Sequence, residues 1–590
     1  MGAQERDPMR HVISIVTIIV AACSSSSEAT PTTQTTQPPA NPANAAKPAP
    51  QKKPDDFAPS TGKEMPKAAA VDPAAHRAAL ARGVAQAEAA KDAAACDQVV
   101  DTISPAAVAL GLKLDATTRP VFVALARCAR EAHRYKVLEL VARAAPSIVQ
   151  ASDLALAFYG QERYAEAAKE LRARLTKTPK DPSLFVVAAR LACKLRDFAK
   201  CRAAADQALA ITKGKRDEEA VGAAARAHVA RFQAAMMLGD YKAARESSGA
   251  LPGEKARETL AKLLVPAERN QLAVDVRALA ILPLGTYHLA GMVNRNLAEL
   301  ALGNGSRKDR QLRVTVEIPG VTVATVKNVV VLSKKVTTVA ITPPFLAGFT
   351  PDSMTSPQRV QLDIKVADGD TVLFEQSGSI ELLPRDYLPT FEKIGEDTMR
   401  PALHNAAAWV TPNDPAVEAL LTAAKARLVG RQSFSGPQSA SLPQVKAIYD
   451  ELQARGVSYV MDPGINSDRF VGQRTRLPAQ VIASTNAQCL EGTLLFASAL
   501  EAIGLDPILV VVPGHAFIGW HASPADKTQR LFLETTMVHS AAFEAAVKKA
   551  VDRVATETKE GHFKNGMSQL LEIKELRAKG ITPQGRGGVR

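Results

Sequence analysis

The chain has 590 residues, which is too many for a single hydrophobic core, so several domains are expected. Apolar residues make up 46% of the chain and aromatic residues only 5%, a balance that favours closely packed, alanine-rich helices. The formal net charge is +13, but basic residues alternate with acidic ones and no run of five basic residues occurs. We therefore interpret the excess charge as a solvated surface suited to an anionic cell envelope, and we expect no nucleic-acid partner.

The first predicted element is an export signal over residues 1–23. Arg6 and Arg10 precede the apolar run "VISIVTIIVAAC". This run is too short to cross a bilayer, which takes roughly 20 apolar residues. Its end, Ala21-Ala22-Cys23, resembles the bacterial lipobox, and the resemblance implies an exported lipoprotein whose lipid on Cys23 anchors it to the membrane, with the periplasmic face of the outer membrane as the expected side. The alternative is an ordinary cleaved signal in which Cys23 is incidental.

Residues 24–72 form the next segment, which is rich in Ser, Thr, Pro, Ala and Gln. Such a composition buries too little apolar surface to offset the conformational entropy of ordering the chain. We expect a disordered tether between the membrane anchor and the folded part of the protein.

Residues 73–305 have the pattern of alanine- and leucine-rich helices with short turns. An aromatic residue recurs at intervals of 29, 34 and 43 residues, at Tyr135, Tyr164, Phe198 and Tyr241. The last three are each followed after three positions by a small residue, in "ERYAEA", "RDFAKC" and "GDYKAA". This pattern resembles degenerate tetratricopeptide repeats, which implies stacked helix pairs that bind a protein partner. The alternative is a non-repeating helical array, and in either case the region serves interaction or spacing.

Residues 306–387 contain six short runs rich in β-branched residues, of which the first is "LRVTVEI" and the last two are "DTVLFEQ" and "GSIELL". Several of them alternate between apolar and polar residues, and turn residues separate them. This pattern predicts an antiparallel β-sandwich of immunoglobulin-like kind. No chemistry is evident in it, so we interpret it as a spacer.

Four cysteines lie in the helical region: Cys96, Cys128, Cys193 and Cys201. An exported protein meets oxidising conditions, so Cys193 could pair with Cys201 and Cys96 with Cys128. Small buried thiols are the alternative, and the sequence leaves both open. After Cys23 is assigned to lipid, Cys489 stands alone, either as an inert core thiol or as a reactive one.

The region 388–590 is predicted to mix helices and strands, and it holds the one plausible reactive constellation. "CLEGTLLFASALEAIG" predicts a helix that begins at Cys489 and ends at Gly504. Unpaired N–H groups at a helix N-terminus stabilise a thiolate and can bind an oxyanion. His515 opens the predicted strand "HAFIGWH", and Glu534 ends the next one. A nucleophile, a base and a carboxylate that orients the base thus follow one another along the chain.

The same residues allow two alternatives, a different base and a metal site. His521 is a rival base, but it lies six residues beyond His515, roughly 20 Å along a strand, so only one of the two histidines can face Cys489. A metal site made of the same three side chains lacks any paired-ligand spacing, so no metal and no cofactor is expected.

The motifs "QRTRLP" (473–478), the cysteine-initiated helix, "PGHAF" and "LETT" resemble a bacterial subgroup of the transglutaminase-like superfamily of papain-type thiol enzymes. The resemblance implies that Cys489 is the nucleophile, His515 the general base and acid, and Glu534 the orienting acid, where the wider superfamily more often has Asp. Gln473 and Gln488 are candidates for oxyanion or substrate contacts.

The resulting prediction is a multidomain α + β lipoprotein. Its C-terminal region would act on amide or peptide bonds through a thioester, by hydrolysis or acyl transfer, on a peptide, protein or cell-wall peptide substrate. The alternative function is a non-catalytic scaffold that works through its helical repeats.

Overall fold

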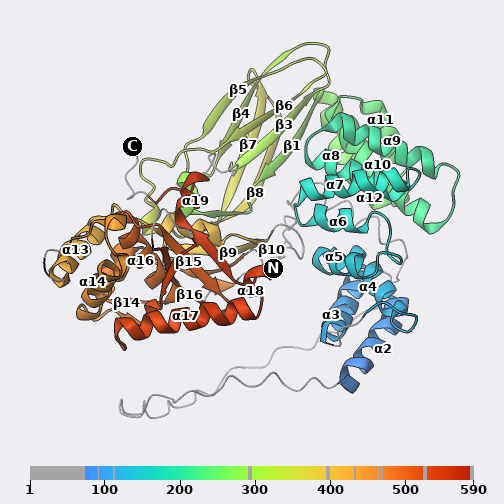
Figure 1. The fold of residues 1–590 in the computed structure, drawn as a ribbon. Coiled ribbons are helices and arrows are strands. Elements are labelled where there is room, and N and C mark those ends of the chain that lie inside the picture. Colours follow the sequence, from blue (N-terminus) through green and yellow to red (C-terminus); the bar gives the residue numbers. More distant parts are fainter. Residues whose placement is uncertain are drawn as a thin grey trace, which may run out of the picture.

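A computed structural model describes residues 73–90, 92–109, 113–289, 296–393, 399–428, 430, 433–461, 465–466, 470–522 and 528–584. The expected export signal, Cys23 and the tether lie outside the described residues. The described part is mixed α and β, with a helical array, a two-sheet region and a C-terminal region arranged in chain order (Figure 1). Within these residues no helix combines the length and apolar character needed to cross a bilayer.

Helices α2 to α12 form the array, and consecutive helices pack against each other. Their bounds are α2 (Pro73–Ala89), α3 (Ala93–Ala109), α4 (Arg119–Glu131), α5 (Tyr135–Ala144), α6 (Asp153–Gly160), α7 (Tyr164–Lys177), α8 (Pro182–Lys194), α9 (Phe198–Thr212), α10 (Glu218–Met237), α11 (Tyr241–Gly249) and α12 (Glu254–Asn270). Each recurring aromatic residue begins a helix, as the sequence predicted, and the small residues Ala167, Cys201 and Ala244 are fully buried at helix contacts. Asp197 and Asp240 cap two of these helices by accepting backbone N–H groups. The likeness to tetratricopeptide repeats remains a prediction.

The helical region ends earlier than expected. We predicted helices up to residue 305, but α12 ends at Asn270 and strands begin at Leu272. Packing explains the difference. Ala273 and Ala301 belong to the hydrophobic core of the last helices, so the sequence of these strands is apolar and rich in alanine, like that of the helices. A Cβ on Gly303 would lie 2.2 Å from the Met237 carbonyl oxygen, which shows how closely strand and helix approach.

The central region consists of two sheets that share one hydrophobic core. One sheet has the strand order β1-β3-β6, and the other has the order β2-β8-β7-β4-β5. The strands are β1 (Leu272–Ala278), β2 (Ile281–Pro283), β3 (Ala298–Asn304), β4 (Arg310–Glu317), β5 (Thr325–Val331), β6 (Val336–Ile341), β7 (Gln358–Asp368) and β8 (Thr371–Leu383). The runs "DTVLFEQ" and "GSIELL", expected as separate strands, form the single strand β8, because Gly378 continues the pairing with β7. The immunoglobulin-like kinship stays a prediction.

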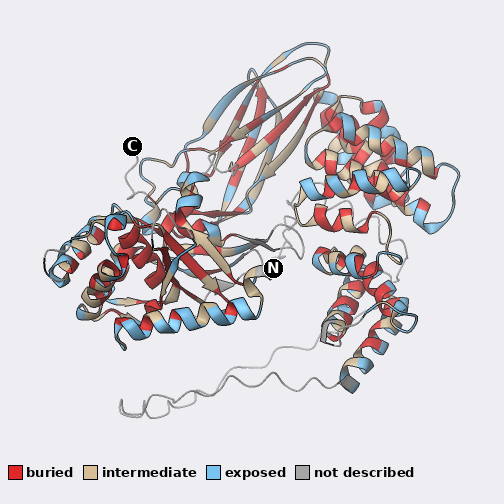
Figure 2. Ribbon diagram, in the orientation of Figure 1, coloured by how far each residue is buried: buried red, intermediate tan, exposed pale blue. Residues whose placement is uncertain are grey.

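The C-terminal region surrounds the buried helix α16. Its helices are α13 (Pro415–Ala424), α14 (Ser441–Ala454), α15 (Pro478–Ser484), α16 (Cys489–Ala502), α17 (Phe543–Lys559), α18 (His562–Asn565) and α19 (Ile573–Ala578). Its strands are β9 (Tyr387–Lys393), β10 (Met399–Pro401), β11 (Ser458–Tyr459), β12 (Ile465–Asn466), β13 (Phe470–Arg474), β14 (Asn486–Ala487), β15 (Pro507–Val512), β16 (His515–His521), β17 (Arg530–Leu533) and β18 (Gln569–Glu572). Every residue from Leu490 to Leu500 is buried, and Figure 2 shows buried residues concentrated on α16 and the neighbouring strands.

Two sheets of this region place the candidate site. One has the order β17-β16-β15-β18, and α16 packs against β15 and β16. The other has the order β10-β9-β13-β12. Its first strand along the chain is β9, which follows β8 after three residues. Arg385 in this connection binds Asp352 of the two-sheet region and Gln584 near the end of the described chain. The C-terminal region is therefore joined to the two-sheet region by side-chain contacts as well as by the chain.

The cysteines of the helical array differ in state. Cys193 and Cys201 form a disulfide between α8 and α9. Cys96 and Cys128 are free thiols and both are buried. Of the two open interpretations, a bridge therefore describes the first pair and buried thiols the second.

Candidate active site

Cys489 occupies the first position of α16, where the sequence placed it. The preceding Gln488 has extended backbone angles, φ −79° and ψ 171°, so the helix begins abruptly at the cysteine. Backbone N–H groups in the first turn have no partner within the helix, and they leave positive partial charge beside the sulfur. The Cys489 side chain is partly exposed, whereas the residues that follow it are buried in the core. The thiol therefore faces solvent from a rigid support.

His515 lies at the start of β16, reached by a tight turn from β15. Gly514 makes this turn with φ 72°, and His515 pairs with Val512 across the hairpin. The Nε2 atom of His515 lies 2.7 Å from Oε2 of Glu534, and since a carboxylate only accepts, Nε2–H is the donor. The other ring nitrogen, Nδ1, is then the one left for the thiol.

Both other members of the constellation influence the pKa of His515. Burial acts to lower this pKa, but hydrogen bonding with Cys489 and with Glu534 outweighs it, and the pKa rises to about 9. The side chain is 26% exposed, so solvent screens these interactions only in part. At neutral pH the imidazole is consequently protonated, which is the state that pairs with a thiolate.

Glu534 is buried and follows directly after β17. Its two carboxylate oxygens have separate partners: Oε2 accepts from His515, and Oε1 accepts from the backbone N–H of Thr536 at 3.0 Å and from its hydroxyl at 2.7 Å. Burial acts to raise the pKa of Glu534, but the bonds and charge of His515 and the bonds from Thr536 lower it below its usual value. The ionised carboxylate can therefore fix the ring of His515.

Gln473 and Gln488 also meet beside Cys489. Gln488 donates from Nε2 to the Arg474 carbonyl oxygen at 2.9 Å, and its Oε1 accepts from Nε2 of Gln473 at 3.2 Å. The same Oε1 lies 3.9 Å from the Cys489 sulfur. Gln488 thus holds the neighbouring segment in place, while Gln473 keeps a second amide hydrogen for another acceptor.

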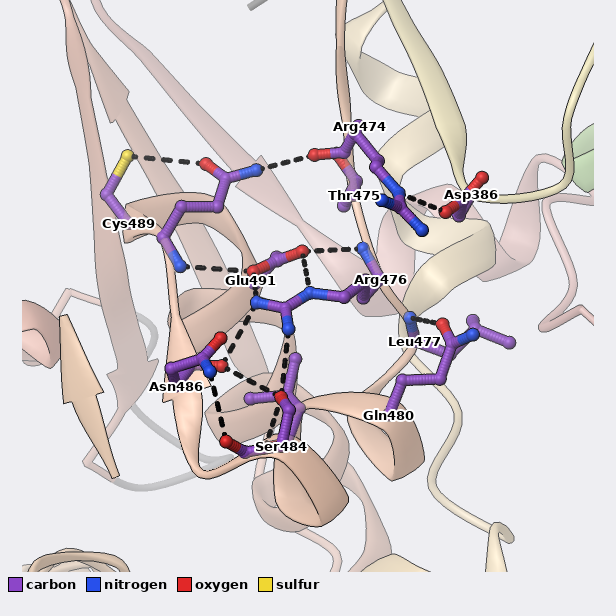
Figure 3. A network of polar contacts seen from close by, with 12 residues as sticks. Asp386, Arg474, Thr475, Arg476, Leu477, Gln480, Ser484, Asn486, Cys489 and Glu491 are labelled. Atoms are coloured by element: carbon purple, nitrogen blue, oxygen red, sulfur yellow. Dashed lines mark hydrogen bonds and ion pairs between the residues drawn. The ribbon is translucent and has the colours of Figure 1, made fainter. Parts of the chain in front are cut away.

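Sequence reasoning missed a charged pair next to the thiol. Arg476, from the motif "QRTRLP", binds the buried carboxylate of Glu491 on α16 (Figure 3). The available signal was the second arginine of that motif together with the acid two residues after the cysteine. Neither was singled out, because a sequence does not show that residues 15 positions apart are neighbours.

His521, the rival base, is remote from the thiol. It lies at the other end of β16, opposite Arg530 of β17, and is buried. Its Nε2 atom is 3.3 Å from Oε2 of Glu572. The β-strand geometry thus separates the two histidines as expected.

One group of side chains among the described residues gathers donor atoms suited to a metal ion: Glu557, Glu560 and His562, at α17 and α18. The Glu557 carboxylate already accepts from His562 and from Ser568 and pairs with Arg553. Its oxygens are therefore occupied within the protein, and the group carries no functional argument.

Comparison of the chain with protein-family models, with curated proteins and with solved structures finds no match.

Proposed function

We propose that the C-terminal region is a transglutaminase-like cysteine enzyme that acts on amide or peptide bonds by hydrolysis or acyl transfer. One observation carries the proposal: Nε2 of His515 lies 2.7 Å from the buried Glu534 carboxylate, and its interactions with Cys489 and Glu534 raise the pKa of His515 to about 9 against the effect of burial. An inert core thiol has no need for a charged imidazole held in this way. The expected export and lipid anchoring at Cys23 remain part of the proposal.

The chemistry follows from these protonation states. The Cys489 thiolate attacks the substrate carbonyl carbon, and a bond forms between sulfur and carbon. When the C–N bond breaks, the leaving amine takes the proton from His515, which leaves a thioester on Cys489. Water or a second amine then attacks the thioester. His515 takes up the proton of the attacking group, and the thiolate leaves.

Two amide donors are suited to the negatively charged oxygen of the tetrahedral intermediate. The backbone N–H of Cys489 lies in the unpaired first turn of α16, and Nε2 of Gln473 has one hydrogen left after bonding Gln488. Donors held before the reaction stabilise the developing charge without reorganising. Gln473 is proposed for this role, and Gln488 is proposed to position it.

The surface beside the thiol supports an extended peptide substrate. Tyr459, Val460 and Met461 leave β11 with 45%, 47% and 78% of their surface exposed. Tyr459 pairs with Ala487 of β14, two residues before Cys489, which places this tyrosine near the thiol. Consecutive exposed apolar side chains at a reactive thiol suit contact with a peptide chain.

The experiment uses protein that lacks residues 1–23, mixed with peptides that contain glutamine and with a fluorescent primary amine. Incorporation of the amine indicates acyl transfer, whereas new peptide ends or deamidated glutamine indicate hydrolysis, and both must vanish in Cys489→Ala. Absence of any product, combined with Cys489 alkylation that His515→Ala leaves unchanged, would refute the enzyme and favour the scaffold.

A further inference from the structure

A buried carboxylate lies next to the candidate nucleophile. Glu491 is the third residue of α16, and its side chain is only 3% exposed. Its Oε2 atom accepts the backbone N–H of Gln488 at 3.1 Å, which closes the start of the helix. A negative charge two residues after Cys489 would on its own repel a thiolate and oppose the helix dipole that favours it.

Arg476 neutralises this carboxylate with several bonds. Its backbone N–H and its Nε donate to Oε1 of Glu491 at 2.7 and 2.9 Å, and its Nη2 donates to Oε2 at 2.7 Å. Figure 3 shows the guanidinium of Arg476 lying against the carboxylate of Glu491. A planar, two-pronged contact of this kind fixes both geometry and charge.

The same guanidinium also holds the chain that leads into the helix. Nη1 of Arg476 donates to the Ser484 hydroxyl at 2.8 Å, and Nη2 donates to the Asn486 carbonyl oxygen at 3.1 Å. One side chain thus connects the end of α15, the strand β14 and the start of α16.

The segment that carries Arg476 is itself fixed from outside the site. Nε of Arg474 donates to Asp386 at 2.6 Å, just before β9, and Trp409 donates from Nε1 to the Thr475 carbonyl oxygen at 2.8 Å. Trp409 is fully buried. Arg476 is therefore presented to Glu491 by a rigid support rather than by a loose loop.

We infer that Arg476 and Glu491 are a positioning pair: together they fix the start of α16, and Arg476 cancels the Glu491 charge so that Cys489 is held as a thiolate. This inference rests on the proposed function of Cys489. The pair contacts neither substrate nor the reacting atoms. It acts through Gln488 and through the electrostatic potential at the sulfur.

The test measures the rate of Cys489 alkylation by iodoacetamide as a function of pH in the full folded chain without residues 1–23. At an effective dielectric constant of about 20, one unit charge roughly 8 to 10 Å away moves a titration by about one pH unit. Arg476→Gln leaves the carboxylate uncompensated and should raise the midpoint of the profile by about one pH unit. Glu491→Gln leaves the guanidinium uncompensated and should lower the midpoint by a similar amount. The double variant Arg476→Gln/Glu491→Gln should return it to within a few tenths of the original value.

A second pair on the same helix provides the matched control. Glu501, near the C-terminal end of α16, binds Arg577 through two bonds at 2.9 and 3.0 Å. It lies 12 residues from Cys489, roughly 18 Å along the helix. Arg577→Gln should lower the thermal midpoint of unfolding without moving the alkylation midpoint. Like Arg476→Gln it breaks an ion pair of α16, but the charge that it leaves uncompensated is far from the sulfur.

Opposite shifts of the two single variants support the inference, since a loss of structure alone would move both in one direction. The inference would be overturned if the alkylation midpoint moved in the same direction in both single variants. It would also be overturned if the midpoint moved in neither of them while His515→Ala did move it. If the profile of His515→Ala is the same as that of the wild-type protein, the proposed function itself is refuted. The failure of the inference and the failure of the proposed function can therefore be distinguished. Should Arg476→Gln not fold, Glu491→Gln and the double variant still give the sign of the effect.

Discussion

Replacing Glu534 by Gln tests how much of the His515 charge depends on the buried carboxylate. The pKa of His515 rises from the usual 6.5 to about 9, which corresponds to roughly 3 kcal/mol in favour of the imidazolium. Cys489 and Glu534 share this stabilisation. A hydrogen bond to a charged group contributes about 1.5–3 kcal/mol, so we assign about half to Glu534. Glu534→Gln should therefore lower the His515 midpoint to about 7.5–8.

The assay is an NMR titration of the His515 ring in wild-type protein and in Glu534→Gln, repeated in Cys489→Ala to separate the contribution of Cys489 from that of Glu534. The free energy of unfolding should also depend on pH, in a direction that the raised pKa fixes. A raised folded-state pKa stabilises the protein fully below about pH 6.5, and this contribution is lost as the pH rises through about 9. Wild-type protein should accordingly lose stability over that interval, and Glu534→Gln should lose less of it. A His515 midpoint that stays near 9 in Glu534→Gln would refute the role of Glu534 as the orienting acid.

Three other predictions concern the anchor and the helical array. Cys193→Ala/Cys201→Ala removes the disulfide between α8 and α9 and should cost about 2–3 kcal/mol of unfolding free energy, measured in denaturant; no change would contradict a stabilising bridge. Gly303→Ala places a methyl group 2.2 Å from the Met237 carbonyl oxygen and should lower stability by about 1–3 kcal/mol, measured in denaturant; unchanged stability would contradict tight packing between β3 and α10. Cys23→Ser should release the protein from the membrane fraction, and unaltered fractionation would contradict the predicted lipid anchor.

Local signals in the sequence predicted the elements of the site well. Cys489 begins a helix and Gly504, with φ 81°, follows its end, because the N-terminal and C-terminal signals of helices are local. His515 opens a strand after a Pro-Gly turn, and Glu534 follows directly after the next strand, one position beyond the strand end at Leu533.

Long-range packing limited the rest of the prediction. The strands between Leu272 and Asn304 were read as helix because they pack against alanine-rich helices and carry similar residues. β18 was not recognised as a partner of β15, and Arg476 was not recognised as a partner of Glu491, since both pairings join segments that are separated along the chain. Conversely, the pairing of Cys193 with Cys201 needed only the short turn between two helices, which the sequence suggested.

The most direct test of the central claim compares the pH dependence of Cys489 alkylation in wild-type protein and in His515→Ala. We expect Cys489 of the wild-type protein to react faster at neutral pH than Cys489 of His515→Ala, because the charged imidazole assists the thiol. The dependence of the rate on pH should also differ between the two proteins. Coincident profiles for the two proteins would contradict the claim that Cys489, His515 and Glu534 form a working site.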